Sequence, residues 1–322
     1  MNRKFIILLS ILTLLILAVG CNSQDETSIN PEESEVAEEV EGVSQVTVEH
    51  RLGEASLQKK PERIIVFDYA TLDTLDKMGI DIIGLPKSNI PTYLQKYNDE
   101  KYQDVGTLFE PNFEKIFELE PDVIFISGRQ AEVYEELSEI APTVFLEVDG
   151  ANYMESVTRN LRILGEIFEK EEFIEAEIAQ INEMIEELNG KVKEAGSNAL
   201  IVMANDGAIS AYGEGSRFGI IHNEFGFEPA DKDIELSNHG QNVTFEYILE
   251  KNPDYIFVID RAATTGGSVT AQQVFDNEII KKTAAYQKDK IVYLSSQIWY
   301  VVSGGLGGTK VMIEDVSTGF AR

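Results

Sequence analysis

The chain has 322 residues, of which 43% are hydrophobic and 9% aromatic, and its formal net charge is −29. This length is large for a single hydrophobic core and favours two lobes. So negative a surface disfavours nucleic acid and anionic membrane surfaces as partners.

The N-terminus has the layout of a bacterial export signal. Arg3 and Lys4 precede an apolar run, residues 5–19, which is too short for a membrane span and suits a signal peptide. Small residues then lead into Cys21, the only cysteine. We predict a signal peptide over 1–20, and the site resembles a lipobox whose Cys21 thiol carries a lipid after cleavage. The alternative is a chance cysteine after an uncleaved anchor.

An acidic segment follows this signal. Residues 22–44 contain eight acids and no base, and they cannot bury enough apolar surface to fold. We therefore predict a disordered tether over 21–44. With Cys21 lipidated, no thiol remains for disulfide or thiolate chemistry.

Strand-like and helical patterns alternate after the tether, as they do in parallel α/β units. This alternation predicts an N-terminal α/β lobe over residues 45–152. The predicted strands are 63–67, 81–85, 123–126 and 143–146, and the predicted helices are 71–78, 112–119 and 130–140.

The alternation stops over residues 153–196, which contain no strand candidate. We predict one amphipathic helix at 153–168 and a second at 171–194, whose apolar residues follow the 3.6-residue period and which Gly196 closes. About 24 residues at a rise of 1.5 Å give a rod of roughly 36 Å. It is either a strut between two lobes, which we favour, or a helix inside one larger domain.

The α/β pattern resumes over residues 197–322, which we predict to form a C-terminal lobe. The expected fold class is therefore α/β, with two Rossmann-like lobes joined by a single long rigid helix. The predicted strands are 199–203, 255–259 and 291–294, and the predicted helices are 216–225 and 245–250.

One segment occurs twice. At an offset of 132, FEKIFELEPDVIFISGR (113–129) and FEYILEKNPDYIFVIDR (245–261) share nine of 17 residues. A helix followed by Pro-Asp and a strand is a common pattern and explains some of these identities, but this pattern requires neither the matching early Glu nor the terminal Arg. A duplicated or convergent lobe explains them better.

Arg129 and Arg261 each follow a strand, where parallel α/β sheets bind ligands. Arg217 follows Ser216, the expected N-cap of helix 216–225, and a helix N-terminus favours anions. Three guanidiniums that converge in so acidic a protein need an anionic guest, such as a carboxylate or catecholate. Each alone is equally consistent with a surface ion pair.

The lipobox, the tether, the lobe–helix–lobe plan and the paired Pro-Asp strands together resemble the siderophore and cobalamin class of substrate-binding proteins for ABC importers. The resemblance covers roughly residues 50–322, with the folded binding domain at about 62–322, and it implies a class III periplasmic-binding-protein fold. VFDYATLDTLDKMG (66–79) and VMANDGAISAYGEGSRFGIIHNEFG (202–226) look like the petrobactin-type catecholate binders of Gram-positive bacteria.

The resemblance also implies roles for residues. Arg129, Arg217 and Arg261 would hold the iron(III) chelate. Glu114 and Glu246 would dock onto arginines of the permease, although both are equally compatible with being ordinary exposed charges. Weaker candidates for the cleft are Lys87, Tyr212, Trp299 and Tyr300.

Other functions fit less well. A protein site for a metal would need several ligands, but of the three histidines His50 lies near the tether. No G-x-S-x-G occurs, and GGLGGTK (304–310) fails the P-loop pattern, which argues against an enzyme. We interpret GGLGGTK as a flexible turn into the last helix.

The sequence and the resemblance therefore predict a monomeric lipoprotein on the extracellular face of the cell membrane of a Gram-positive bacterium. It would deliver a ferric siderophore to an ABC permease and its ATPase, with iron(III) carried by the siderophore and no cofactor. The alternatives are a citrate or hydroxamate siderophore, haem, or an enzyme on a similar fold.

Overall fold

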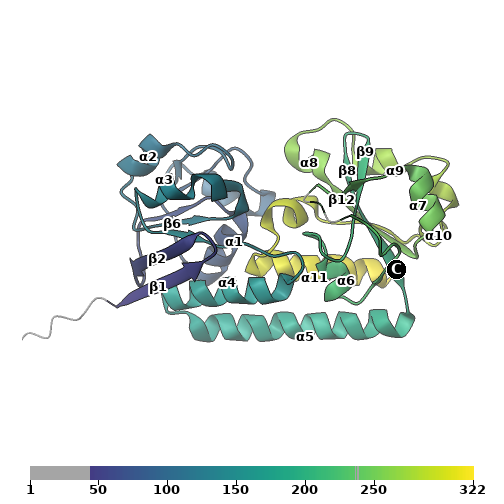
Figure 1. The fold of residues 1–322 in the computed structure, drawn as a ribbon, viewed down its shortest axis with the longest axis horizontal. Coiled ribbons are helices and arrows are strands. Elements are labelled where there is room, and N and C mark those ends of the chain that lie inside the picture. Colours follow the sequence, from purple (N-terminus) through teal and green to yellow (C-terminus); the bar gives the residue numbers. More distant parts are fainter. Residues whose placement is uncertain (1–43, 236, 238) are drawn as a thin grey trace, which may run out of the picture. The chain divides into compact units, whose positions relative to one another are not determined.

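The computed structural model describes residues 44–235, 237 and 239–322. The predicted signal peptide, Cys21 and all but the last residue of the predicted tether lie outside them. The described part has the α/β fold class that the sequence predicts, with two sheets flanked by helices and one long helix, α5, alongside both (Figure 1).

The described part begins with a hairpin that the sequence analysis does not predict. Strand β1 (Gln45–His50) pairs antiparallel with β2 (Gly53–Gln58). Val46, Val48 and Leu57 are buried while their neighbours along each strand are exposed, so the hairpin covers the N-terminal lobe with one apolar face.

The N-terminal lobe contains a five-stranded parallel sheet in the order β5-β4-β3-β6-β7. All residues of β3, β6 and β7 are buried, because helices cover both faces of a parallel sheet. The strands are β3 (Ile64–Val66), β4 (Gly84–Leu85), β5 (Gln103–Asp104), β6 (Val123–Ile126) and β7 (Thr143–Phe145). The helices are α1 (Tyr69–Met78), η1 (Thr92–Asn98), α2 (Phe113–Glu118), η2 (Gly128–Val133) and α3 (Tyr134–Ser138).

The C-terminal sheet has the order β11-β9-β8-β12-β13, with β10 also beside β8. Strand β9 is antiparallel to β8, because Asp206 and Gly207 both have positive φ and form a tight hairpin turn. The strands are β8 (Asn198–Asn205), β9 (Ala208–Tyr212), β10 (Glu228–Pro229), β11 (Gln241–Asn242), β12 (Tyr255–Asp260) and β13 (Ile291–Tyr293). The helices are α6 (Ile220–Asn223), α7 (Phe245–Lys251), α8 (Arg261–Thr265), α9 (Ala271–Phe275), η3 (Ile280–Lys282), α10 (Ala284–Gln287), the π-helical turn η4 (Ile298–Val302) and α11 (Leu306–Phe320).

Two helices connect the sheets. Helix α4 spans Tyr153–Phe168 and α5 spans Glu171–Ala195, each within one residue of its predicted bounds. Gly196 ends α5 with φ +61°, as expected for a left-handed cap. In Figure 1, α5 extends past α4 at one end and past α11 at the other. The apolar face of α5 that packs against the protein consists of Ile174, Ile178, Ile181, Ile185, Leu188 and Val192.

The largest apolar cluster is shared by both lobes. It contains Ile64 of β3 and Ile201 of β8, together with apolar residues of α1, α4, α5 and α11. The opposite face of each sheet has its own cluster, which includes Ile65 in the N-terminal lobe and Val202 in the C-terminal lobe. Because the lobes share a core, opening them widely would expose apolar surface.

The glycines before and within α11 allow close contact between the lobes. Asp73 of α1 is fully buried, and its Oδ2 accepts backbone N–H groups of Gly307 and Gly308 at 2.6 and 3.0 Å. A Cβ at Gly305 or Gly307 would lie 2.6 or 2.7 Å from an Asp73 carboxylate oxygen. The segment 304–310, predicted as a flexible turn, therefore contributes only Gly304 and Gly305 to a turn, and Leu306–Lys310 form the first helical turns of α11.

The repeated segment occupies equivalent places. Asn112 caps α2 and Thr244 caps α7, each through a side-chain oxygen that accepts a backbone N–H. Strand β6 lies between β3 and β7, and β12 lies between β8 and β13. The two copies thus place Arg129 and Arg261 after the corresponding strand of each sheet.

Candidate functional site

The three arginines singled out by sequence line one cleft between the lobes. Arg129 lies in η2 just after β6, Arg261 opens α8 just after β12, and Arg217 lies in the turn before α6. The cleft has a volume of about 950 Å³ and is lined by residues of both lobes. It is therefore located beyond the carboxyl ends of parallel strands, where such sheets bind ligands.

Tyr300 of η4 holds all three guanidiniums. Arg129 and Arg217 each donate from Nη2 to the Tyr300 carbonyl oxygen, at 3.3 and 2.7 Å. The shared acceptor brings these two guanidiniums close together. Arg261 donates from Nε to the Tyr300 hydroxyl at 2.9 Å. The Tyr300 ring also lies 5.0 Å from the Arg217 Cζ and 5.7 Å from the Arg261 Cζ.

The acceptors of these guanidiniums are all neutral. Besides Tyr300, Arg261 donates to the Asn205 amide oxygen at 2.9 Å. Among the described residues, none of the three arginines forms an ion pair with an acid. Burial, and then the positive charge of Arg129, lowers the pKa of Arg217. The arrangement is thus a positive cluster that, among the described residues, has no direct carboxylate partner.

The cleft also contains two carboxylates. Asp68 caps α1, and its Oδ2 accepts the N–H and hydroxyl of Thr71, both at 2.9 Å. Burial raises the pKa of Asp68, which weakens its tendency to carry charge. Glu147 is paired with Arg51. Neither acid contacts the three-arginine cluster, although Asp68 lies close enough to Arg129, and Asp206 close enough to Arg261, for their charges to interact through space.

The predicted local structure around Arg217 is wrong. Helix α6 is four residues long, and its N-cap is Gly219 instead of Ser216. The Ser216 hydroxyl accepts the N–H of Phe218 at 3.3 Å, and the N–H of Gly219 bonds to the Ser216 carbonyl, which forms a turn. Arg217 is therefore positioned by its contacts with Tyr300 and the Phe218 ring, and not by a helix N-terminus.

The four weaker candidates separate into two pairs. Tyr300 and Tyr212 line the cleft, and burial raises the pKa of Tyr212 to about 12. Trp299 is fully buried and donates its indole N–H to Asp315 at 2.9 Å, so the structure places it in the core and not at the cleft. Lys87 donates its ammonium to the carbonyl oxygens of residues 98 and 99, away from the cleft lining.

Some cleft residues escape sequence reasoning. Asn205 positions Arg261, Phe109 is 71% exposed and offers an aromatic face, and the exposed His239 also lines the cleft. Arg51 enters the cleft from the β1–β2 turn. None of these residues belongs to a sequence pattern that marks a binding site.

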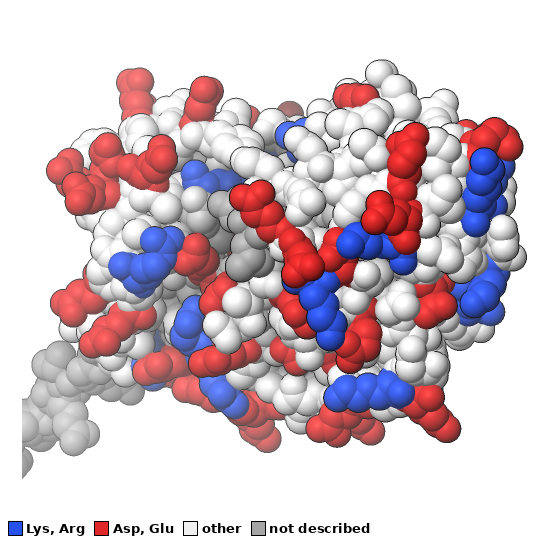
Figure 2. All heavy atoms as spheres, turned by 45° about the vertical axis from the view of Figure 1, so that its right-hand side comes forward, with Lys and Arg blue, Asp and Glu red and all other residues white. Residues whose placement is uncertain are grey.

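The two predicted docking glutamates are on outer helices. Glu114 lies in the first turn of α2 and Glu246 in the first turn of α7, and both are exposed. Figure 1 shows these helices in different lobes. Acidic side chains are also spread across the face in Figure 2, so exposure alone does not distinguish these two.

Two further findings concern the described residues only. No group of three or more His, Cys, Asp or Glu side chains among them is arranged to hold a metal ion. Within the same residues, no helix combines the length and apolarity needed to cross a membrane.

Comparisons with known proteins give consistent matches. A model of the periplasmic binding protein family matches residues 64–298. The petrobactin-binding protein YclQ of Bacillus subtilis is 42% identical over 99% of this chain and 100% of its own, and its crystal structure superposes with a TM-score of 0.85 over 87% and 99% of the two chains.

Two solved structures extend this likeness. The periplasmic catecholate-siderophore binding protein VctP of Vibrio cholerae is 36% identical, with a TM-score of 0.82 over 85% of this chain and 100% of the other. The siderophore binding protein BauB, solved with two acinetobactin molecules and ferric iron, is 31% identical, with a TM-score of 0.79 over 86% and 99%.

Proposed function

Because the chain belongs to the periplasmic binding protein family, we propose that it binds an anionic ferric siderophore between its lobes and delivers it to an ABC importer. The observation that carries this proposal is the cluster of Arg129, Arg217 and Arg261 on Tyr300, with no acidic partner among the described residues. A ligand with several anionic oxygens would supply the negatively charged partners that these arginines lack.

Arginine suits this task because it stays charged and grips paired oxygens with two N–H groups. On binding, the chelate would replace Tyr300 as the acceptor for Arg129 and Arg217. The siderophore would coordinate iron(III), and the protein would contribute charge and shape, without a cofactor or a catalytic step.

The relatives favour a catecholate among possible chelates. The names of YclQ and VctP specify petrobactin and a catecholate siderophore. A petrobactin-like ligand, with catecholate and citrate oxygens, would present enough negative charge for three guanidiniums. A hydroxamate complex carries less negative charge and would leave the cluster partly uncompensated.

Delivery needs a surface that the permease recognises. We propose Glu114 and Glu246 for it, since they occupy equivalent positions in the two copies of the repeat. The shared core would limit the hinge motion, so the bound form would change the spacing of these residues only slightly.

The remaining elements concern location and organisation. A lipid on Cys21 would hold the protein at the extracellular face of the membrane, and the acidic tether would separate it from the anionic surface. We propose residues 45–152 and 197–322 as the lobes, 153–196 as the connector, and a monomer as the working form.

The test is a fluorescence titration with iron-loaded siderophores. Trp299, the only tryptophan, has its ring 6.4 Å from that of Phe218, which borders the arginine cluster. Ferric petrobactin should quench this fluorescence and saturate, whereas a ferric hydroxamate should bind far more weakly. Quenching by haem or a hydroxamate, but by no catecholate, would show that the ligand class is wrong.

A further inference from the structure

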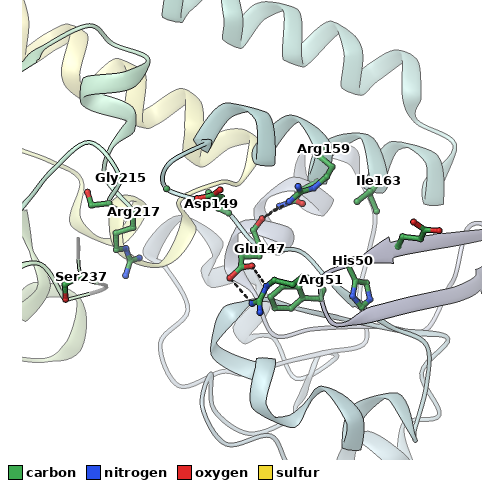
Figure 3. A pocket seen from close by; sticks show the side chains of 15 residues that line it. His50, Arg51, Glu147, Asp149, Arg159, Ile163, Gly215, Arg217 and Ser237 are labelled. Carbon is green, nitrogen blue, oxygen red and sulfur yellow. Dashed lines mark hydrogen bonds and ion pairs between the residues drawn. The ribbon is translucent and has the colours of Figure 1, made fainter. Parts of the chain in front are cut away.

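A second hollow adjoins the cleft. It has a volume of about 760 Å³ and lies between the β1–β2 turn, the segment 145–150, helix α4 and the turn at 215–217 (Figure 3). We call it the annex. The annex and the cleft adjoin, since five residues line both of them: Arg51, Glu147, Val148, Asn160 and Arg217.

Arg51 lies where the two hollows meet. Its Nε and Nη2 donate to the two carboxylate oxygens of Glu147 at 2.8 and 3.1 Å, and its Cζ lies 5.1 Å from the centre of the Phe145 ring. The Arg51 side chain is 59% exposed and that of Glu147 is 39% exposed. Arg51 is therefore a fourth cleft guanidinium, whose charge Glu147 cancels.

We propose that Arg51 is a further ligand-binding residue, held by Glu147 in the empty protein and transferred to an anionic chelate that extends from the cleft into the annex. This inference rests on the proposed function. Glu147 would then act as a competitor that lowers the affinity for anions and favours chelates large enough to reach Arg51.

Moving Arg51 from Glu147 to the ligand would require little free energy. An exposed ion pair such as Arg51–Glu147 is weak and is screened by salt. A chelate bound by the three-arginine cluster would instead present further charged oxygens to Arg51. The Phe145 ring keeps the guanidinium near the boundary of the two hollows.

Glu147 would retain a basic neighbour after the transfer. Arg159 of α4 donates from Nη2 to the Glu147 carbonyl oxygen at 3.5 Å, and Figure 3 shows both arginines reaching toward Glu147. Arg159 is exposed and, among the described residues, forms no ion pair, so it is available to turn toward the Glu147 carboxylate. Arg159 would then be shared between Glu147 and Asp149, with which it already interacts electrostatically, so the released charge would be compensated in part.

The experiment compares dissociation constants for ferric petrobactin in the full folded protein. We expect Arg51→Ala to weaken binding by about tenfold, the usual loss for one charge-assisted contact. We expect Glu147→Gln to tighten binding by about fivefold, because Arg51 is then free for the ligand. In the double variant, Arg51→Ala with Glu147→Gln, the second change should tighten binding relative to Arg51→Ala alone by less than half of the factor that it gives when Arg51 is present.

Glu175→Gln is the matched control. Glu175 accepts bonds from both Nε and Nη2 of Arg162, at 2.6 and 3.0 Å, in a somewhat more exposed pair outside the cleft, and its loss should leave affinity unchanged. The proposal is overturned if Arg51→Ala binds within twofold of the unmodified protein, or if Glu147→Gln fails to tighten binding. If the unmodified protein binds no ferric chelate, the proposed function fails and this inference with it. Circular dichroism excludes misfolding.

Discussion

The three arginines on Tyr300 and an arginine on the outer surface have different partners. Arg162 forms a two-bond pair with Glu175 in solvent, whereas Arg129, Arg217 and Arg261 donate to neutral oxygens and contact no acid among the described residues. In a chain with 56 acids and 27 bases, pairing is the expected outcome for a basic side chain. The difference supports the proposal that these three arginines bind an anion that comes from outside the protein.

The strongest test of this comparison reverses two cleft charges. Each charge-assisted bond contributes about 1.5–3 kcal/mol, so Arg129→Glu combined with Arg261→Glu should weaken ferric siderophore binding by about 1,000-fold or more. Isothermal titration calorimetry measures the loss, and thermal unfolding confirms the fold. Arg162→Glu, the surface counterpart, should bind normally. A double variant within tenfold of the unmodified affinity would remove both arginines from the site.

A carboxylate outside the cleft should affect stability instead of binding. Asp231 accepts from the Lys251 ammonium at 2.8 Å and from the Tyr247 hydroxyl at 2.7 Å, and the bond from Lys251 is the main cause that lowers the pKa of Asp231 to about 2. A shift of that size corresponds to about 2 kcal/mol of stability at neutral pH. Asp231→Asn should lower the free energy of unfolding by about that amount, with ligand affinity unchanged.

The pH dependence of this effect has a defined sign. Because folding depresses the Asp231 pKa, its contribution is fully present above the unfolded pKa of about 4 and is lost as the pH falls through about 2. Urea unfolding at several pH values measures it. The difference between the unmodified protein and Asp231→Asn should shrink on acidification, and a constant difference would show that the carboxylate charge is not responsible.

A conservative change at Arg217 tests whether charge alone is sufficient. Lysine keeps the charge but lacks the planar fork that contacts both the Tyr300 carbonyl and its ring, so Arg217→Lys should weaken binding by about tenfold. Equilibrium titration with ferric petrobactin provides the measurement. An unchanged dissociation constant would mean that only charge matters at this position.

The smallest effect on ligand affinity is expected at Tyr300, which accepts hydrogen bonds from the three arginines when no ligand is bound. Tyr300→Phe removes the hydroxyl that accepts from Arg261 but keeps the ring and the backbone carbonyl. Affinity should change by less than about fivefold, because this hydroxyl holds Arg261 within the empty protein and all three guanidiniums proposed to face the ligand are retained. A loss as large as that of the charge-reversed protein would indicate that the hydroxyl itself contacts the ligand.

Local patterns predict much of this fold. The 3.6-residue period predicts α4 and α5 within one residue at each end, and the repeat places Arg129 and Arg261 correctly after their strands. The antiparallel β9 is missed although its Asp-Gly turn is a readable signal, and Ser216 is mistaken for a helix cap because its turn has the same local chemistry.

The site itself depends on contacts that no local pattern contains. Arg129 and Arg217 lie 171 and 83 positions from Tyr300, whose carbonyl they share. Arg51 and Glu147 are separated by 96 positions. Tertiary folding alone brings these groups together, so sequence can name the arginines but cannot identify their common acceptor.

The most direct test of the account is a crystal structure of the protein with ferric petrobactin. We expect Arg129, Arg217 and Arg261 each to donate to a ligand oxygen at about 2.7–3.2 Å, and the Tyr300 carbonyl to have lost at least one of its two guanidinium bonds. A chelate bound elsewhere, with all three arginines still on Tyr300, would contradict it.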